Sequence, residues 1–183
     1  MGSIQNSEYY DKIYSTDPSY DVHYTKSVYY TMWLEVMKLV QTYAKNTIIM
    51  DAGCGTGQFA QMLRENGYTK YIGMDFSEVA IQKAKEKFDS NSSITFICYD
   101  VNEGMGQCNL LIALEFLEHI DDLIFLKDYT DTDIIFTVPD FDNPAHVQYF
   151  SNEESIRIYY KNHIEFESIT KFHKYFICKG KIK

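Results

Sequence analysis

The sequence IIMDAGCGTG, residues 48 to 57, decides the fold. Three apolar residues lead into an acid and a G-x-G-x-G turn, a pattern typical of a buried strand that ends in a ligand-binding loop. Glycine suits such a loop because it lacks a Cβ and readily adopts positive φ. Residues 58–66 then place apolar side chains at helical spacing, and Gly67 ends the run. We predict a strand, a glycine loop and a helix, the opening of a nucleotide-type βαβ unit.

The loop excludes two common nucleotide-binding motifs. A dinucleotide fingerprint needs a third glycine where Gln58 stands. A phosphate-binding loop of the Walker type needs Gly-Lys-Ser/Thr, which residues 56–58 do not supply. The segment resembles the first motif of class I S-adenosylmethionine (SAM) dependent methyltransferases, an acid followed by G-x-G-x-G. SAM carries no phosphate, so such a loop passes the methionine portion of the cofactor and does not grip an anion.

This resemblance implies an α/β fold: a doubly wound, seven-stranded Rossmann-like sheet, mostly parallel, that closes with a C-terminal antiparallel hairpin. Residues 1–183 are expected to form one methyltransferase domain, with an N-terminal lid segment and helix in residues 1–44 and the core sheet in residues 45–183. After the first strand, apolar runs predict six further strands, at residues 71–75, 94–99, 109–113, 133–138, 164–172 and 175–183.

Helices are predicted at three further places. Residues 27–44 carry apolar side chains at three- and four-residue steps. Ser77 is a candidate N-cap for the helix that follows the second strand. Ser151, with Glu154 three residues later, resembles a capping box. Residues 1–26 are polar and rich in tyrosine and show little helical periodicity.

The resemblance also assigns cofactor contacts. Asp75 ends the second strand, where a carboxylate can accept hydrogen bonds from two ribose hydroxyls, and Phe76 beside it would flank the adenine. Asp100 would face the exocyclic amine of adenine, with the Val101 backbone near a ring nitrogen. The N-terminal segment of such enzymes closes over SAM. The expected cofactor-binding residues are therefore Asp51, Gly53, Cys54, Gly55, Gly57, Asp75, Phe76, Asp100, Val101 and the lid residue Tyr24, with His23, Tyr29 and Tyr30 as further lid candidates.

A second motif follows the fourth strand. On a helix, Glu115, Glu118 and His119 would share one face, and His146 follows the fifth strand at the same sheet edge. The segment resembles the ubiquinone-pathway O-methyltransferases and the small-RNA 2′-O-methyltransferases, which implies a Mg²⁺, Mn²⁺ or Zn²⁺ site made of these four residues. The alternative is catalysis without metal, with His119, His146 and Glu118 as acid–base groups or packing residues.

The composition of the chain narrows the range of methyl acceptors and partners. The net charge of −9 disfavours nucleic acid as a partner, because an acidic surface repels phosphate backbones. Four cysteines without C-x-x-C spacing indicate reduced thiols and a cytoplasmic protein, and no apolar run reaches the length of a membrane span. We expect a monomer or homodimer that methylates an oxygen of a small molecule. An N-methyltransferase, an RNA-end methyltransferase and a non-catalytic SAM-binding partner protein remain as alternatives.

Overall fold

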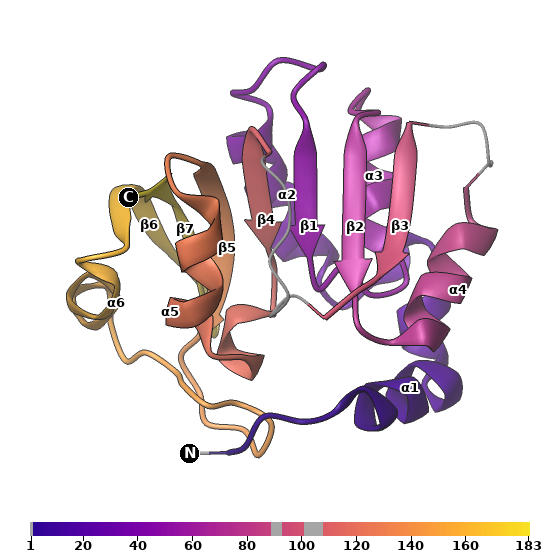
Figure 1. The fold of residues 1–183 in the computed structure, drawn as a ribbon, viewed down its shortest axis with the longest axis horizontal. Helices are drawn as coiled ribbons and strands as arrows, with labels where there is room; N and C mark the ends of the chain where they lie inside the picture. Colours follow the sequence, from indigo (N-terminus) through magenta and orange to yellow (C-terminus); the bar gives the residue numbers. More distant parts are fainter. Residues whose placement is uncertain (1, 89–92, 101–107) are drawn as a thin grey trace.

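A seven-stranded mixed sheet forms the centre of the computed structural model, which describes residues 2–88, 93–100 and 108–183 (Figure 1). The strand order is β3-β2-β1-β4-β5-β7-β6. The first five strands run parallel, whereas β7 is antiparallel to β5 and β6 is antiparallel to β7. This order confirms the predicted doubly wound sheet with its C-terminal hairpin.

The elements follow the predicted strand positions closely. The strands are β1 (Ile49–Ala52), β2 (Tyr71–Asp75), β3 (Ile94–Cys98), β4 (Leu110–Ala113), β5 (Asp133–Pro139), β6 (Ile164–Phe172) and β7 (Tyr175–Ile182). The α-helices are α1 (Ser7–Thr16), α2 (Tyr30–Val40), α3 (Gln58–Glu65), α4 (Glu78–Glu86), α5 (Asp122–Phe125) and α6 (Glu153–Tyr160).

Apolar layers cover both faces of the sheet. Successive strand side chains point to opposite faces, so Leu110 and Ile112 of β4 join one layer while Leu111 and Ala113 join the other. Helices α2, α3 and α4 cover the first face, and α5 and α6 cover the second. With both faces covered, the loops at the carboxyl ends of the parallel strands are the places for a site.

The N-terminal segment crosses this carboxyl edge. In Figure 1 the arrowheads of β1, β2 and β4 point toward it. The Asp11 carboxylate of α1 accepts hydrogen bonds from the Ser77 hydroxyl (2.5 Å) and the Val79 N–H (3.3 Å) at the start of α4. Lys83 donates to the Tyr14 carbonyl (2.8 Å). Polar contacts thus hold α1 in place, which explains why residues 1–26 lacked the apolar periodicity by which we predicted helices.

Three local predictions need correction. Residues 115–119 do not form an α-helix, because Glu115 has a φ of +53° and only Leu117–His119 make a short 3₁₀ turn. Helix α6 is capped by Asn152, whose side chain accepts from the Ser155 N–H at 2.9 Å, one residue later than predicted. Helix α2 covers Tyr30–Val40, which is shorter than residues 27–44. Ser77 does cap α4, accepting from the Ala80 N–H at 3.1 Å.

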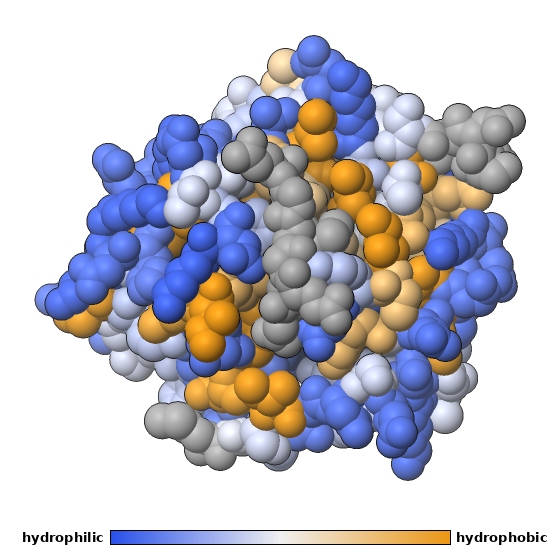
Figure 2. Space-filling model, viewed as in Figure 1, coloured by the Kyte–Doolittle hydropathy of each residue, from blue (hydrophilic) through white to orange (hydrophobic). Residues whose placement is uncertain are grey.

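The surface mixes hydrophilic and apolar residues. On the face in Figure 2, hydrophilic residues cover both flanks, and apolar residues gather in small groups toward the middle and the bottom of the view. In the described ranges, no helix has the length and apolar character needed to cross a membrane.

Candidate methyl-transfer site

The glycine loop after β1 is left-handed at each of its three glycines. Gly53, Gly55 and Gly57 have φ values of +73°, +52° and +76°. A Cβ on Gly53 would lie 2.5 Å from the Phe116 ring, so a larger residue there meets strain and a clash. The N–H groups of Gly53 and Cys54 donate to the Met74 carbonyl at 2.8 and 2.9 Å, which fixes the loop against β2.

Two buried carboxylates flank this loop. Asp75 accepts from the Gly55 N–H through Oδ2 and from the Ser77 N–H through Oδ1, both at 2.9 Å. Burial raises the pKa of Asp75 to about 6, although these bonds lower it. Asp51 accepts from the Tyr71 hydroxyl at 2.6 Å, and burial raises its pKa to about 7. Both acids therefore titrate close to neutral pH.

Two adjoining cavities lie between the carboxyl edge and α1. The first has a volume of about 300 Å³ and the second a volume of about 360 Å³. They share Tyr10, Tyr14, Gly53, Glu115 and His119, so these residues stand at the junction. Residues of the glycine loop line the first cavity, and residues at the ends of β2 and β3 line the second. The other lining residues of the first cavity include Asp51, Cys54, Thr56, Tyr20, Tyr29, Phe141, His146 and Tyr175; those of the second include Asp75, Phe76, Tyr99 and Asp100.

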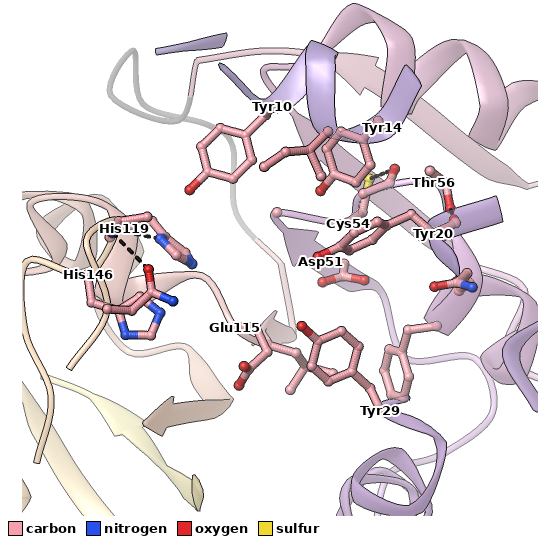
Figure 3. A pocket seen from close by; sticks show the side chains of 18 of the residues that line it. Tyr10, Tyr14, Tyr20, Tyr29, Asp51, Cys54, Thr56, Glu115, His119 and His146 are labelled. Atoms are coloured by element: carbon pink, nitrogen blue, oxygen red, sulfur yellow. Dashed lines mark hydrogen bonds between the residues drawn. The ribbon is translucent and has the colours of Figure 1, made fainter. Parts of the chain in front are cut away.

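Two histidines on one wall of the first cavity lie beside Glu118, which is buried and lines neither cavity itself. Figure 3 shows His119 and His146 side by side, with Tyr10 and Tyr14 projecting from α1. The ring centroids of the two histidines are 5.0 Å apart, and ligand atoms of Glu118, His119 and His146 lie within 4.8 Å of one another. The Nδ1 of His119 lies 2.8 Å from the Ala145 carbonyl, and that of His146 lies 3.4 Å from the Phe141 carbonyl. A donating Nδ1–H leaves each Nε2 as the basic nitrogen.

Burial controls the charge of this cluster. Glu118 is fully buried, and its carboxyl oxygens have no side-chain hydrogen-bond partner among the described residues; only the backbone N–H groups of Phe116 and Glu118 approach them. Burial, with the nearby Glu115 charge, raises the pKa of Glu118 well above its usual value. Burial lowers the pKa of His119 to about 4 and also lowers that of His146, so both imidazoles are neutral at pH 7.

Glu115 points to a different wall. Its N–H donates to the Thr137 hydroxyl (2.8 Å), which in turn donates to its carboxylate at 2.9 Å. Tyr175 also hydrogen-bonds this carboxylate, and burial raises the Glu115 pKa to about 7. The structure thus gathers three of the four predicted metal ligands and leaves Glu115 outside the group. The reason is the left-handed backbone at Glu115, which replaces the helix on which the prediction depended.

The structure places the predicted cofactor residues unequally. The cavities are lined by Asp51, Gly53, Cys54, Gly55, Asp75, Phe76 and Asp100. Gly57 lines neither cavity, and Val101 lies outside the described residues. Tyr24 lines neither cavity. Its hydroxyl donates to Glu65 at 2.7 Å, and His23 lies 3.3 Å from the same carboxylate. Of the four lid candidates only Tyr29 reaches the cavity.

Sequence reasoning missed the tyrosines that cover the site. Tyr9, Tyr10, Tyr14 and Tyr20 line the first cavity, and Tyr10 and Tyr14 also line the second. The four-residue step from Tyr10 to Tyr14 places both on one face of α1. That step, in a tyrosine-rich segment, was the available signal.

This fold and the glycine-loop site define a SAM-dependent methyltransferase, and comparisons with known proteins agree. Residues 49–127 match the family model described as a methyltransferase domain. An uncharacterized methyltransferase of Schizosaccharomyces pombe is 30% identical over 118 residues, covering 52% of this chain and 81% of the relative. A putative methyltransferase of Bacillus subtilis is 31% identical over 108 residues, covering 59% of this chain and 40% of that protein.

Solved structures share the fold. The magnesium protoporphyrin IX methyltransferase of Synechocystis with bound SAM superposes with a TM-score of 0.71 at 18% identity, covering 100% of this chain and 99% of the other. A putative methyltransferase of Haloferax volcanii, solved in complex with the Trm112 activator, gives a TM-score of 0.74 at 11% identity, covering 94% and 96%. The chain belongs to the class I SAM-dependent methyltransferases, and its cofactor is SAM.

Proposed function

We propose that the protein transfers the methyl group of SAM to a hydroxyl oxygen of a small-molecule acceptor, with Glu118, His119 and His146 as a divalent-metal site. The observation that carries the proposal is the grouping of these three side chains, with ligand atoms within 4.8 Å of one another: His119 and His146 line the first cavity, and the buried Glu118 lies next to them. The alternative without metal gives the same residues acid–base roles.

The donor set fits a divalent cation. Two neutral imidazoles and a carboxylate suit Mn²⁺ or Zn²⁺, and Mg²⁺ through the carboxylate. Burial favours the protonated form of Glu118, and a bound cation would stabilise the ionised carboxylate and displace that proton. The Ala145 and Phe141 carbonyls hold the Nδ1 sides of the imidazoles, an outer-shell arrangement that orients Nε2 toward a ligand.

The two cavities suggest how the cofactor lies. We place the adenosine of SAM in the second cavity, beside Asp75, Phe76 and Asp100, and its methionine part in the first, beside the glycine loop. The transferred methyl group then lies at the junction, near Glu115 and His119. The Asp51 carboxylate offers the methionine ammonium a buried negative partner.

The chemistry requires alignment more than activation. The sulfonium of SAM is a strong electrophile, so the protein holds the acceptor oxygen in line with the methyl–sulfur bond and excludes water. A divalent cation at the cluster would lower the pKa of an acceptor hydroxyl that binds it. His119 and His146, both neutral, have Nε2 available to bind that cation or, without it, to accept the hydroxyl proton.

The cavity walls favour a small, uncharged acceptor. Neither Lys nor Arg is found among the described lining residues, and aromatic rings make up much of the first cavity. Phosphates and carboxylates are bound mainly by such cationic side chains. The wall composition therefore speaks against an RNA-end acceptor and for a hydroxylated aromatic compound that packs between rings.

A methylation assay tests this proposal. We expect mass spectrometry to detect SAM-dependent O-methylation of a simple catechol, with little reaction of aniline-type amines or a short capped RNA. EDTA should abolish the reaction, and Mn²⁺ or Zn²⁺ should restore it. Glu118→Gln should lose the metal response, whereas Glu154→Gln, at an exposed site on α6, should retain it. Transfer to the amine or the RNA would overturn the acceptor class, and full activity in EDTA would overturn the metal role.

A further inference from the structure

The first residues of the chain pair with the loop that carries His146. The Gly2 N–H donates to the His146 carbonyl at 2.8 Å, and the Ser3 N–H donates to the Pro144 carbonyl at 3.1 Å. In Figure 1 the N-terminal end lies beside this loop. We call these two backbone bonds the N-terminal clip.

The loop under the clip controls both histidines. It contains His146 itself, and its Ala145 carbonyl faces Nδ1 of His119 at 2.8 Å. On its other side, the Val147 N–H donates to the Glu118 carbonyl at 2.8 Å. The loop thus lies between the N-terminal segment and the 117–119 turn. A shift of this loop would move one imidazole and release the other.

The close fit at Gly2 shows how specific the contact is. A Cβ at this position would lie 2.0 Å from the Pro144 carbonyl oxygen and 2.8 Å from that of Asn143. Both are backbone atoms, so they cannot move aside as a flexible side chain would. Only glycine permits the segment to lie this close to the loop.

We propose that Gly2 and Ser3 are positioning residues that hold the His119–His146 pair in the geometry used for metal binding and methyl transfer. The clip acts through the main chain of residues 144–146 and touches neither cofactor nor acceptor. The part that concerns metal rests on the proposed function. The part that concerns histidine geometry stands on the contacts alone.

Three variants isolate the clip. Gly2→Ala introduces the clash with the Pro144 carbonyl. Ser3→Pro removes the second N–H donor. Ser3→Ala is the matched control, because it keeps that N–H and removes only a hydroxyl that accepts a hydrogen bond from the Gln5 amide. Helix α1 retains its own contacts to Ser77, Val79 and Lys83, so affinity for S-adenosylhomocysteine should stay within about twofold in all three.

The first measurement is histidine labelling of the metal-free protein with diethylpyrocarbonate, read by peptide mass spectrometry. We expect labelling of His119 and His146 to become at least several-fold faster in Gly2→Ala and Ser3→Pro and to stay unchanged in Ser3→Ala. His163 and His173, which lie outside the cavities, serve as internal references. Unchanged rates in Gly2→Ala and Ser3→Pro would overturn the proposal.

The second measurement is titration with Co²⁺, followed by its visible absorption. Loss of an outer-shell contact typically costs metal sites 10- to 100-fold in affinity, and we expect a loss of about tenfold or more in Gly2→Ala and Ser3→Pro. A wild-type protein that binds no Co²⁺ would contradict the metal role in the proposed function, while the labelling result would still decide the clip. Equal Co²⁺ affinity in wild type and Gly2→Ala would overturn the clip's role in metal binding.

Discussion

The two halves of the site differ in how the chain satisfies its own polar groups. In the cofactor half, Asp75 accepts hydrogen bonds from Gly55 and Ser77, and Asp51 accepts one from Tyr71. In the acceptor half, the buried carboxyl group of Glu118 has no side-chain partner among the described residues, and only backbone N–H groups approach it. The polar groups of the cofactor half are thus satisfied before any ligand binds, whereas the Glu118 carboxyl group of the acceptor half is not.

This difference separates structural from chemical tasks. A satisfied carboxylate fixes the backbone around it, so its removal should damage cofactor binding. A buried carboxyl group without good hydrogen-bond partners costs free energy even when it is protonated, so its replacement should stabilise the ligand-free protein and also remove a ligand-binding group. Changes made in the two halves should therefore move stability and binding in different directions.

The largest effect is expected from Asp75→Ala. The change leaves the N–H groups of Gly55 and Ser77 without their acceptor and removes the proposed partner of the ribose. Unpaired buried donors cost about 1–3 kcal/mol each, so the affinity for S-adenosylhomocysteine should fall by about 100-fold or more in calorimetric titration. Asp128→Ala, at an exposed position, serves as the control. Near-wild-type affinity would show that Asp75 does not organise the cofactor half.

Glu118→Met should show the opposite pattern. Methionine fills a similar volume without a polar group to desolvate, so the thermal midpoint of the metal-free protein should rise by a few degrees. Any stabilisation of the wild type by Mn²⁺ should disappear in the variant. Differential scanning fluorimetry with EDTA and with Mn²⁺ measures both. A lower midpoint in EDTA would mean that Glu118 has a structural partner, and the contrast between the halves would fail.

The pH dependence of SAM binding tests the charge of the cofactor half. Asp51, with a pKa of about 7, is mostly protonated at pH 6 and mostly ionised at pH 8. The ionised carboxylate attracts the positive charges of SAM, so binding should strengthen as pH rises, by about tenfold over this range. SAM itself also titrates in this range, so its affinity for Asp51→Asn is measured at each pH as well. The ratio of the two affinities then reports the effect of Asp51 alone. A constant ratio of the two affinities from pH 6 to 8 would contradict a role for the Asp51 charge.

The same contrast explains how far the sequence could predict the site. The cofactor half depends on neighbours in the chain: Asp51 and Gly53 to Gly57 form one continuous motif, and Asp75 ends the next strand. Strand periodicity and glycine spacing predicted the strands and the loop, and the resemblance to class I methyltransferases supplied the fold that brings these residues to one sheet edge.

The acceptor half depends on contacts between distant segments. Glu115 departs from the helix predicted for it because the hydroxyl of Thr137, on β5, accepts from its N–H and donates to its carboxylate. The hydrogen bond from Gly2 to His146 joins residues 144 positions apart in the sequence. Neither contact has a local sequence signal, so single-sequence reasoning places the histidines at one edge but not the atoms that orient them.

The smallest effect is expected where both halves meet, at Tyr10. Its ring lies 5.3 Å from that of Phe76 and 5.9 Å from that of His119, between centroids, and its buried hydroxyl has no partner among the described residues. Tyr10→Phe keeps both ring contacts and removes only the hydroxyl. We expect an unchanged thermal midpoint and, if the hydroxyl serves a ligand, a loss of a few-fold in affinity, since a single hydrogen bond contributes about 0.5–1.5 kcal/mol.

The ligand whose affinity falls in Tyr10→Phe will show to which half of the site the Tyr10 hydroxyl belongs. A higher KM for SAM with an unchanged KM for the acceptor would assign the hydroxyl to the cofactor half, and the reverse would assign it to the acceptor half. Tyr9→Phe, whose more exposed ring also lines the first cavity, is the matched control. A clear drop in the midpoint of Tyr10→Phe would instead show that the hydroxyl stabilises the fold, and the residue at the junction would then resemble Asp75 more than Glu118.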